Sequence, residues 1–589
     1  MSIRDKKIIV LWALALFPSI VSGQLSGNIE GLGLWNFKQG HKEDVKLALK
    51  FDTTKMDMTF KISGGHKYNP TTETTSVLDA KNPESLYSKY EDKQLYKRNW
   101  NINTELDFGL RLTKQDNLTL GLAYNYKGDK DRPLLSTYRY DIYGDSLTGT
   151  QQDTSYTTEH ILKPKLVYSH VFGKADNSIL IRLTGLFSTK EEGYKRITDG
   201  DFYNKHRYYS TLSSLNDIDT RMQVYYQDAS LGKVVDLGFT GGLDIVWHND
   251  IDLYGGWNNV GGTWKDSSDL DRSHLYSSFA VEPNVKISYK HNGFEFYINE
   301  RVQWYWDQLI NRLNERTSPD EYEFRDSEWQ NILSADIGYR FNNRHRIDLT
   351  YNRILDRPKY EKLNPSFTIG KSEGEYFRGN PFLKPTTKDE VGLTYGFMAE
   401  HFGTDLTVGY RYTKDKVEKV LDVASADSTI FTYINANKQH TGGAILDLKV
   451  DYSAVQAKMW VGTFYDIFIK EDNSFDKSDF NFEVGMSLNA ALTPSMHLSS
   501  DLVYKSAKAS AYSLKGEYIG ANVQLTKTFT VAPYRYHRTN SFLDLYIKIN
   551  DLVDKPDYEQ TWNKEMTYYK VVEKTLNRRS VHIGINYKF

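Results

Sequence analysis

The chain has 589 residues, of which 39% are hydrophobic and 14% aromatic, and it contains 43 tyrosines but no cysteine. The lack of cysteine excludes disulfides, thiolate metal sites, cysteine nucleophiles and a lipid-modified N-terminal cysteine. The formal net charge is -2, with 74 basic and 76 acidic side chains, so the balance of charge does not indicate a nucleic-acid partner.

Residues 1–23 have the pattern of a secretory signal peptide. A basic start precedes an apolar run over 8–17, which is too short for a membrane-spanning helix. The small residues within 21–23 then offer a cleavage site, which would leave Gln24 as the new N-terminus. An uncleaved anchor is the alternative. The sequence therefore predicts export, with 24–589 forming one barrel domain.

From Gln24 onward, apolar and polar side chains alternate in one segment after another. Leu118, Leu120 and Leu122, for example, are separated by Thr119 and Gly121. The same alternation recurs over 335–341, 347–351, 391–398, 405–412 and 579–589. Because successive strand side chains point to opposite faces, each segment has one apolar face and one polar face. This pattern predicts an all-β fold, a transmembrane antiparallel β-barrel whose strands face lipid with alternate residues.

Counting hairpins backward from Phe589 predicts about 22 strands, with the first near 28–37 and a range of about 20 to 24. Short turns are expected near Thr53, Lys114, Gly173, Lys233, His291, Asn342, Glu400, Ser453 and Thr493. Long loops are expected over 65–98, 128–157, 189–218, 249–274, 307–329, 356–386 and 552–578. Short periplasmic turns with long extracellular loops are typical of outer-membrane barrels. A barrel of this size is on the order of 40–45 Å wide, too wide for its side chains to fill.

One segment departs from the alternation. Over 294–306 every second side chain is apolar except Glu300, which would face lipid at a cost in stability. A β-bulge that resets the phase of the strand is predicted here.

The polar face of the predicted strands carries charges of both signs. The candidate lumen-lining residues are Arg182, Arg301, Arg340, Arg411, Asp236, Asp244, Asp336, Asp348, Asp405 and Glu483. One interpretation is a charged channel lining that holds water and selects solutes. The alternative is a salt-bridged wall that only solvates the interior, and the mixture of signs argues against a strongly anion- or cation-selective pore.

Aromatic residues fall into two groups. The first lies near predicted strand ends and is interpreted as the membrane-interface girdle: Trp247, Trp304, Trp306, Tyr339 and Phe341. The second lies in predicted external loops: Trp257, Trp264 and Trp329. These loop tryptophans could stack on a sugar ring or anchor a partner, with packing inside the loops as the alternative.

Catalytic and cofactor motifs are not apparent in the sequence. The 14 histidines show no metal-ligand spacing, and neither a Gly-x-Ser-x-Gly elbow nor a phosphate-binding loop occurs. The prediction is therefore that the protein is not an enzyme and has no cofactor.

Three phrases resemble TonB-dependent receptors of the outer membrane. Residues 357–385 contain Arg-Pro, Leu-Asn-Pro and Gly-Asn-Pro-Phe-Leu-Lys-Pro, which are similar to the mid-barrel loop of that family. Phe542 to Asp554 resembles the penultimate strand, and the end of the chain resembles the last strand. The resemblance implies that Tyr587 and Phe589 form the signal that the barrel-assembly machinery recognises. It covers only the barrel: few residues separate Gln24 from the first strand, so neither a plug domain nor a TonB-contacting box is expected.

The sequence thus predicts a protein of the bacterial outer membrane, surrounded by its lipids. The leading hypothesis is a solute pore or a partner-gated transport channel. The rival hypothesis is a structural barrel subunit of a larger outer-membrane or surface complex. A lipoprotein or a separate plug-bearing chain is the kind of partner that either hypothesis allows.

Overall fold

The computed structural model describes residues 24–36, 41–79, 89–142, 145–172, 177–200, 207–228, 236–260, 263–266, 272–313, 322–365, 367–369, 375–424, 429–436, 438–469, 475–531, 541–553, 555, 557–562, 568–576 and 579–588. The predicted signal peptide (1–23) and Phe589 lie outside these residues. No helix in these ranges is long and apolar enough to cross a membrane.

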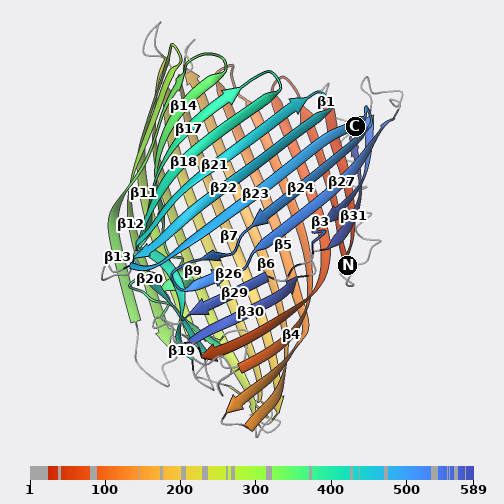
Figure 1. Cartoon of the computed structure of the whole chain (residues 1–589), viewed down its shortest axis with the longest axis vertical. Helices are drawn as coiled ribbons and strands as arrows, with labels where there is room; N and C mark the ends of the chain where they lie inside the picture. The colour runs from red at the N-terminus through yellow and green to blue at the C-terminus, as the bar shows by residue number, and fades with distance from the viewer. Residues whose placement is uncertain are drawn as a thin grey trace.

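Nearly all of the described chain is antiparallel β-sheet, and 27 of its strands join into one sheet. These strands build a tall curved wall (Figure 1). Its N-terminal part consists of β1 (Gln24–Asn36), β2 (His41–Asp52), β3 (Met56–Asp79), β4 (Lys89–Arg111), β5 (Asp116–Ile142), β6 (Asp145–Phe172), β7 (Asn177–Gly200), β8 (Arg207–Asp228), β9 (Asp236–Val260), β11 (Arg272–His291), β12 (Phe294–Leu313) and β13 (Tyr322–Arg340).

The C-terminal part of the wall continues the same order with shorter strands. It consists of β14 (His345–Asp356), β17 (Thr386–Met398), β18 (Phe402–Lys414), β21 (Lys438–Tyr452), β22 (Val455–Ile469), β23 (Phe475–Thr493), β24 (Met496–Lys505), β27 (Tyr518–Val531), β28 (Ser541–Asn550) and β31 (Ser580–Lys588). Each wall strand is antiparallel to its neighbours, and β31 pairs with β28 on one side and with β1 on the other.

The register of the strands separates an apolar face from a polar face. Residues directly opposite each other on antiparallel strands share a face. Leu349 of β14 lies opposite Leu393 of β17, which lies opposite Val408 of β18, and all three side chains are exposed. Their neighbours Asp348 and Thr407 belong to the other face. The alternation seen in the sequence therefore describes the wall correctly.

The short turns fall where the sequence predicts them. The turns expected near Thr53, Lys114, His291, Asn342, Glu400, Ser453 and Thr493 correspond to the connections 53–55, 112–115, 292–293, 341–344, 399–401, 453–454 and 494–495. Asn292 and Gly293 have φ angles of 47° and 80°, which suit a tight hairpin turn. The expected turns at Gly173 and Lys233 lie outside the described residues.

The prediction of long irregular loops is wrong for the N-terminal part of the wall. Within the expected loop 65–98, β3 continues to Asp79 and β4 begins at Lys89, and the expected loop 128–157 is likewise mostly strand. Trp257 lies in β9, Trp264 in β10 (Thr263–Asp266) and Trp329 in β13, so none of the three is in a loop. Where water meets both faces of a strand, apolar alternation is not needed, and the backbone ladder can continue without it.

The predicted bulge at Glu300 is also wrong. Pairing of β12 with β13 is unbroken, and Glu300 keeps its place on the apolar face opposite Leu333. The Nδ2 group of Asn331 donates a hydrogen bond of 2.5 Å to the Glu300 Oε1 atom. Glu300 lies four residue pairs from the Trp304–Trp329 pair on the same face. Its carboxylate therefore finds a hydrogen-bond donor on the neighbouring strand while the strand keeps its register.

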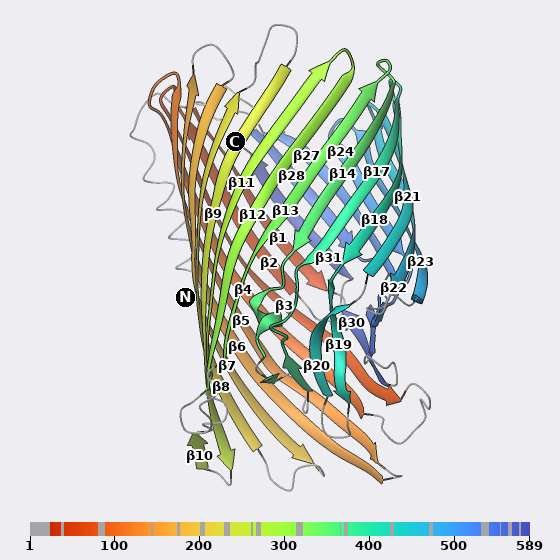
Figure 2. The same cartoon turned by 90° about the vertical axis from the view of Figure 1, so that its left-hand side faces the viewer.

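A second, smaller sheet packs against the polar face of the wall. It contains β15 (Phe367–Ile369), β16 (Glu375–Arg378), β20 (Thr429–Ala436) and β19 (Lys416–Ala424), in that order, and follows the short helix α2 (Tyr360–Leu363). β16 and β20 are parallel. Figure 2 shows β19 and β20 beside the lower part of the wall. We call these four strands the inner sheet.

Two apolar clusters attach the inner sheet to different parts of the wall. One contains Tyr276 of β11 and Leu309 of β12 with Leu363 and Leu383, and Val417 and Tyr433 of the inner sheet pack against it. The other contains Phe468 of β22, Tyr512, and further inner-sheet residues, namely Val420 and Ala436. The strands β13, β14, β17, β18 and β21 lie between these two attachment points.

Short strands extend the wall beyond β1 and β2, at the end where the inner sheet lies. β25 (Lys508–Ala509) pairs with β26 (Ser513–Lys515), which pairs with β29 (Asp557–Trp562). β29 pairs with β30 (Tyr568–Leu576), and β30 pairs with the C-terminal half of β3. The long β3 strand thus pairs with β2 along its N-terminal half and with β30 along its C-terminal half.

Candidate functional site: the polar face of the wall and its inner sheet

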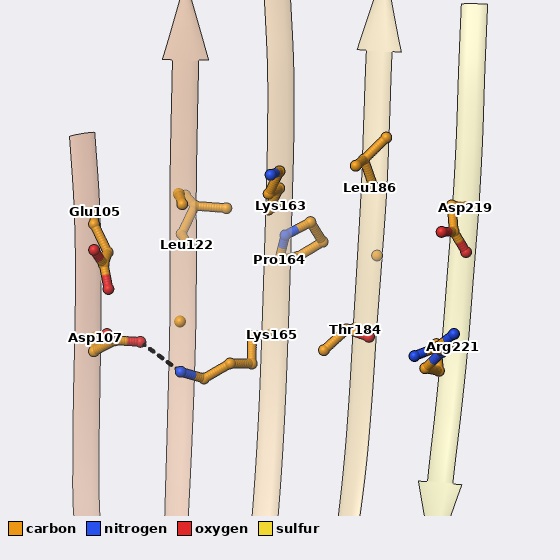
Figure 3. Close-up of a pocket in the computed structure, with 13 residues that line it drawn as sticks. Glu105, Asp107, Leu122, Lys163, Pro164, Lys165, Thr184, Leu186, Asp219 and Arg221 are labelled. Atoms are coloured by element: carbon orange, nitrogen blue, oxygen red, sulfur yellow. Dashed lines mark hydrogen bonds and ion pairs between the residues drawn. The ribbon is translucent and has the colours of Figure 1, made fainter. Parts of the chain in front are cut away.

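A polar pocket of about 430 Å³ lies on the β4–β8 part of the wall. Its charged lining consists of Glu105 and Asp107 of β4, Lys163 and Lys165 of β6, and Asp219 and Arg221 of β8. Figure 3 shows the side chains of Asp107 and Lys165 pointing toward each other across the intervening strand. Their ion pair measures 3.1 Å between the Lys165 Nζ and Asp107 Oδ1 atoms.

Two glycines and a proline shape this pocket. A Cβ atom at Gly121 of β5 would lie 2.6 Å from the Asp107 Oδ1 atom, so glycine leaves room for the ion pair to pass over β5. Pro164 has no backbone N–H, and the pairing of β6 with β7 is interrupted beside it, opposite Gly185. The residues with little or no side chain, Gly121 and Gly185, and Pro164 thus form the bottom of the pocket, and charged side chains surround it.

The lining of this pocket carries charged groups of both signs. The carboxylate of Asp219 has a buried Oδ1 atom with no hydrogen-bond partner within the described part of the chain, while Arg221 lines the pocket two residues away on the same strand. Lysine, arginine and carboxylate groups on one rim can bind a solute that carries both an acceptor and a cation. Among the described residues no group of three or more His, Asp or Glu side chains could hold a metal ion.

The predicted lumen residues lie on the polar face, but the structure does not gather them into one site. Four of those on the C-terminal wall are paired. Asp348 and Asp405 both contact Arg346, at 3.4 and 3.1 Å, and Arg411 contacts Glu390 at 2.6 Å. Glu483 pairs with Lys505 at 3.1 Å. These pairs agree with the alternative of a salt-bridged wall.

The remaining candidates are spread over the other polar strands. Arg182 donates a 3.5 Å hydrogen bond to Gln223, and Arg301 lies 4.0 Å from Glu282. Arg340 and Asp336 lie on the polar side of β13, opposite Arg346 and Thr350. The backbone of Asp244 is opposite Gln223 and Glu282, and that of Asp236 is opposite Lys290. Their role in lining a channel stays a prediction.

Sequence reasoning missed Asp107, Lys165, Arg221 and the Arg346 pair. Part of the signal was present, because Asp107 and Lys165 stand between apolar neighbours. The strand register, which brings Asp107 and Lys165 together across β5, is a non-local property that the alternation does not contain.

Trp329 lies on the apolar face opposite Trp304, with 6.2 Å between ring centroids, and 66% of its surface is exposed. This position fits the interpretation given to Trp304, a membrane-interface girdle, which stays a prediction. At the other end of the strand Tyr339 and Phe341 contact each other edge to face at 4.9 Å. The backbones of Trp257 and Trp264 lie in the β9–β10 pair, and the proposed partner contact of these two residues stays a prediction.

The loop that carries the Gly/Pro phrase is attached to the wall by Arg357. Its Nη2 atom lies 2.5 Å from the Asp307 Oδ2 atom, and its guanidinium carbon lies 3.4 Å from the centroid of the Tyr305 ring. Asp307 lies three residues beyond Trp304 on β12, toward the inner sheet. Burial raises the pKa of the Asp307 carboxyl, and the Arg357 charge opposes this effect.

Gly379 is needed for space and not for a left-handed backbone. Its N–H donates to the Asn364 carbonyl at 2.7 Å, and a Cβ atom there would lie 2.3 Å from that oxygen. Among the described glycines only Gly293 has a positive φ, so Gly379 does not adopt a left-handed backbone. The next residue, Asn380, donates to the Tyr433 carbonyl and so attaches the loop to the inner sheet.

Asp466 of β22 lies near the second attachment point of the inner sheet, the one that contains Phe468. Its side chain is fully buried and accepts hydrogen bonds from Thr441 at 2.5 Å, Gln439 at 2.8 Å and Asn481 at 2.9 Å. Lys508, from the connection between β24 and β27, lies 3.8 Å away. This carboxylate thus links the wall strands β21, β22 and β23 with one another and with Lys508. It adds polar contacts beside the apolar contacts of Phe468.

The C-terminal strand β31 pairs with β28 and with β1. Tyr587 lies opposite Leu543 of β28 and Ile29 of β1, on the apolar face. Its role in assembly stays a prediction, together with that of Phe589.

Comparison with known proteins identifies the architecture. Residues 320–587 match the model of the Outer membrane protein beta-barrel family. No curated protein sequence matches the chain. Among solved structures, the siderophore receptor PiuA from Acinetobacter baumannii is similar over 97% of this chain and 82% of its own, with 12% identity and a TM-score of 0.61.

Two other transport proteins show the same likeness. The ferric yersiniabactin uptake receptor FyuA from Yersinia pestis aligns over 97% of this chain and 81% of its own, with 11% identity and a TM-score of 0.57. The ferric citrate transporter FecA aligns over 97% and 79%, with 9% identity and a TM-score of 0.61. At these identities the likeness concerns the fold. The chain is a β-barrel membrane protein of the bacterial outer membrane, and its fold is that of the siderophore-receptor barrels.

Proposed function

We propose that the chain forms a closed barrel of about 22 strands that carries polar solutes across the outer membrane, with the inner sheet narrowing the passage. The observation that carries this proposal is the pairing of β31 with β1 in register from Asn28–Lys588 to Asn36–Ser580. A sheet whose last strand pairs with its first has no free edge, which is what a membrane-spanning sheet requires. The apolar face then meets lipid and the polar face lines the lumen.

The orientation follows from the lengths of the connections. Barrels of this class place short turns in the periplasm and long connections outside the cell. The short turns here lie at one end of the wall, and the long hairpins and the inner sheet lie toward the other. The inner sheet would therefore face the extracellular side of the lumen.

The polar face supports passage of small solutes that carry hydrogen-bonding groups of both kinds. The pocket at Asp107, Lys165 and Arg221 offers both signs of charge, and the paired charges of the C-terminal wall keep the lining hydrated without a strong net field. The inner sheet packs on that lining at two places, so it is the element placed to control the width of the passage.

Single-channel conductance in planar bilayers tests the proposal. Arg357→Ala removes the contact with Asp307 and should release the loop that carries α2, so conductance or open probability should rise above that of the wild type. Arg353→Ala is the matched control, because it removes an arginine–aspartate pair of 2.6 Å with Asp389 on the apolar face. Wild type and Arg357→Ala channels that both stay silent at every voltage would contradict the pore proposal.

We also propose that a second chain completes the gate, either a lipoprotein or a separate plug-bearing protein. A lumen of this width is too large for the side chains and one small sheet to fill. Purification in mild detergent from the native membrane should recover such a partner in stoichiometric amount. Recovery of the barrel alone, with full conductance, would contradict this part.

Export and assembly are part of the same proposal. Residues 1–23 are proposed to be removed on export, so the mature protein should begin at Gln24, which N-terminal sequencing would determine. Truncation of the chain before Tyr587 should leave the protein unassembled in the periplasm.

A structural role as a partner-binding subunit is the second candidate. The observation that favours it is the height of the N-terminal hairpins, since β5 has 27 residues and β6 has 28. A membrane-spanning strand needs only about 9–11 residues, so much of each hairpin lies outside the bilayer. Shortening the β5–β6 hairpin should abolish partner recovery and leave conductance unchanged if this role is the main one.

A further inference from the structure

Two strands of the N-terminal wall carry a tyrosine–histidine cluster on their apolar face. His160 of β6 lies opposite Tyr126 of β5, with 5.0 Å between ring centroids, and its Nδ1 atom lies 2.8 Å from the hydroxyl of Tyr124. Tyr124 is eight residues after Asp116, the first residue of β5, and His160 is twelve residues before Phe172, the last residue of β6.

The same cluster recurs on the C-terminal wall with the same spacing. His440 of β21 lies opposite Tyr412 of β18, with 5.1 Å between centroids, and its Nδ1 atom lies 2.5 Å from the hydroxyl of Tyr410. Tyr410 is eight residues after Phe402, and His440 is twelve residues before Tyr452. We call these the β5–β6 cluster and the β18–β21 cluster.

Both clusters lie at the outer edge of the apolar band. A tilted strand climbs about 2.5 Å per residue, so eight to twelve residues correspond to about 20–30 Å above the short turns. The apolar band of such barrels is about 25 Å tall, which places the two clusters at the level where hydrocarbon meets the polar headgroups of the outer leaflet.

The two clusters differ in what lies immediately above them. In the β5–β6 cluster the residue two positions beyond Tyr126 is Gly128, and a Cβ atom there would lie 2.1 Å from the Trp100 indole nitrogen. The indole of Trp100 also donates to the hydroxyl of Tyr126 at 3.2 Å, so an aromatic ring covers this position. The corresponding place two residues before His160 is taken by Thr158.

In the β18–β21 cluster both of these places are lysines. Lys414 is two residues beyond Tyr412, and Lys438 is two residues before His440. Lys438, His440, Tyr410 and Tyr412 line a pocket of about 530 Å³ together with Ile469, which lies opposite Lys438 on β22. The Trp100 indole thus fills the space beside the β5–β6 cluster, whereas the corresponding space beside the β18–β21 cluster is a pocket next to lysines.

We propose that the β18–β21 cluster binds the phosphate group of a phosphorylated outer-leaflet lipid. Lysine ammonium groups donate charge-assisted hydrogen bonds to phosphate oxygens, and the tyrosine hydroxyls and imidazole add directional contacts. The Ile469 side chain and the tyrosine rings offer an apolar surface to the first carbons of the acyl chains. The inference rests on the proposed orientation of the barrel and is independent of whether the barrel conducts.

Native mass spectrometry of the purified barrel, released from detergent, tests this site with diphosphoryl lipid A as the probe. The wild type should retain the probe, and dephosphorylated lipid A should be retained about tenfold less well. Lys438→Gln and His440→Gln should each weaken retention by about the same factor. His160→Gln is the matched control, since it changes the same histidine in the β5–β6 cluster and should leave retention unchanged.

Several results would overturn the proposal. Equal retention of the phosphorylated and dephosphorylated probes would show that only the apolar part is bound. Retention that is unaffected by Lys438→Gln and His440→Gln, or that falls equally in His160→Gln, would place the lipid elsewhere. Displacement of the probe by millimolar inorganic phosphate would identify a free anion as the ligand. Heat-dependent migration in gels verifies that each variant is folded, and conductance recorded in parallel separates a failure here from a failure of the pore proposal.

Discussion

The N-terminal and C-terminal parts of the wall continue beyond the membrane in different ways. From β3 to β9 the strands have 22 to 28 residues, and their hairpins simply extend the sheet. From β14 to β31 the wall strands have 9 to 19 residues, and the chain between them folds back onto the polar face. The N-terminal part thus extends the sheet along the barrel axis, whereas the C-terminal part places chain on the polar face.

Different interactions stabilise the extensions of the two parts: backbone pairing in the N-terminal part and side-chain contacts in the C-terminal part. An extended hairpin satisfies its backbone groups through the ladder, so its side chains can be polar on both faces. Among the described strands the inner sheet has no backbone pairing with the wall, so side chains must hold it there, namely Arg357 and two apolar clusters. Asp466 adds a side-chain contact to the short β25 strand through Lys508. Single substitutions should therefore have large effects in the C-terminal part and small effects in the N-terminal part.

Asp466→Ala is the substitution with the largest expected effect. It leaves the donors of Gln439, Thr441 and Asn481 without their buried acceptor, and the free energy of unfolding should fall by about 3 kcal/mol. Urea unfolding in a defined lipid, followed by tryptophan fluorescence, measures this. Asp466→Asn keeps the shape and one acceptor oxygen and should lose less. An alanine variant as stable as the wild type would show that Asp466 is not the anchor.

Gly379→Ala should come next, at about 2 kcal/mol, because the added Cβ atom meets backbone that cannot move without opening the loop. Its effect should be local: limited proteolysis should cut the loop over 357–385 faster, while the β5–β6 hairpin keeps its protection. Gly442→Ala is the control, since a Cβ atom there has no atom within 4 Å. Equal protection of the loop in both variants would contradict this reading.

The wall itself was predictable because its signal is local. Alternation along 335–341 or 391–398 depends only on neighbouring residues and on the lipid outside, so the strands and the turns at Thr53 and Asn342 could be located. The tall hairpins were missed because water on both faces removes the contrast on which the alternation depends. Backbone pairing continues there without any apolar signal.

The inner sheet could not be derived from alternation, since β16 pairs in parallel with β20 across a long stretch of chain. A signal for its position was nevertheless present. Phe468 and Leu309 are apolar residues on the polar face, and each is almost fully buried by the inner sheet or its loops. An apolar side chain among lumen charges indicates that something covers it. The pocket at Asp107 depends on register and needed the structure.

Acidification should release the inward connections by a smaller amount. Glu517 is bonded by Lys555 and accepts from the Tyr504 hydroxyl at 2.9 Å, and these bonds lower the pKa of its carboxyl below 4.5. A lowered pKa means that the contact stabilises the folded state above pH 4.5 and is lost as the pH falls below that value. The link joins the connection after β24 to the connection after β28, so only these two should loosen.

A spin label can follow this release because the chain has no native cysteine. A label attached at Ala507→Cys should become more mobile as the pH is lowered from 6 to about 3.5, and the change should be absent when Glu517→Gln is added. A label response that persists in the Glu517→Gln background would assign the transition to another group.

Lys127→Ala in the N-terminal part should have the smallest effect, although its ion pair with Glu159 is short at 2.9 Å. Lys127 is half exposed, so solvent screens the pair, and the loss should not exceed about 0.5 kcal/mol. Urea unfolding under the conditions used for Asp466→Ala gives the comparison directly. Glu159→Ala should reproduce the result, because either change removes the same pair. A loss above about 1 kcal/mol would mean that side chains support the tall hairpins as strongly as they support the inward connections, and the contrast between the two parts would then lie only in geometry.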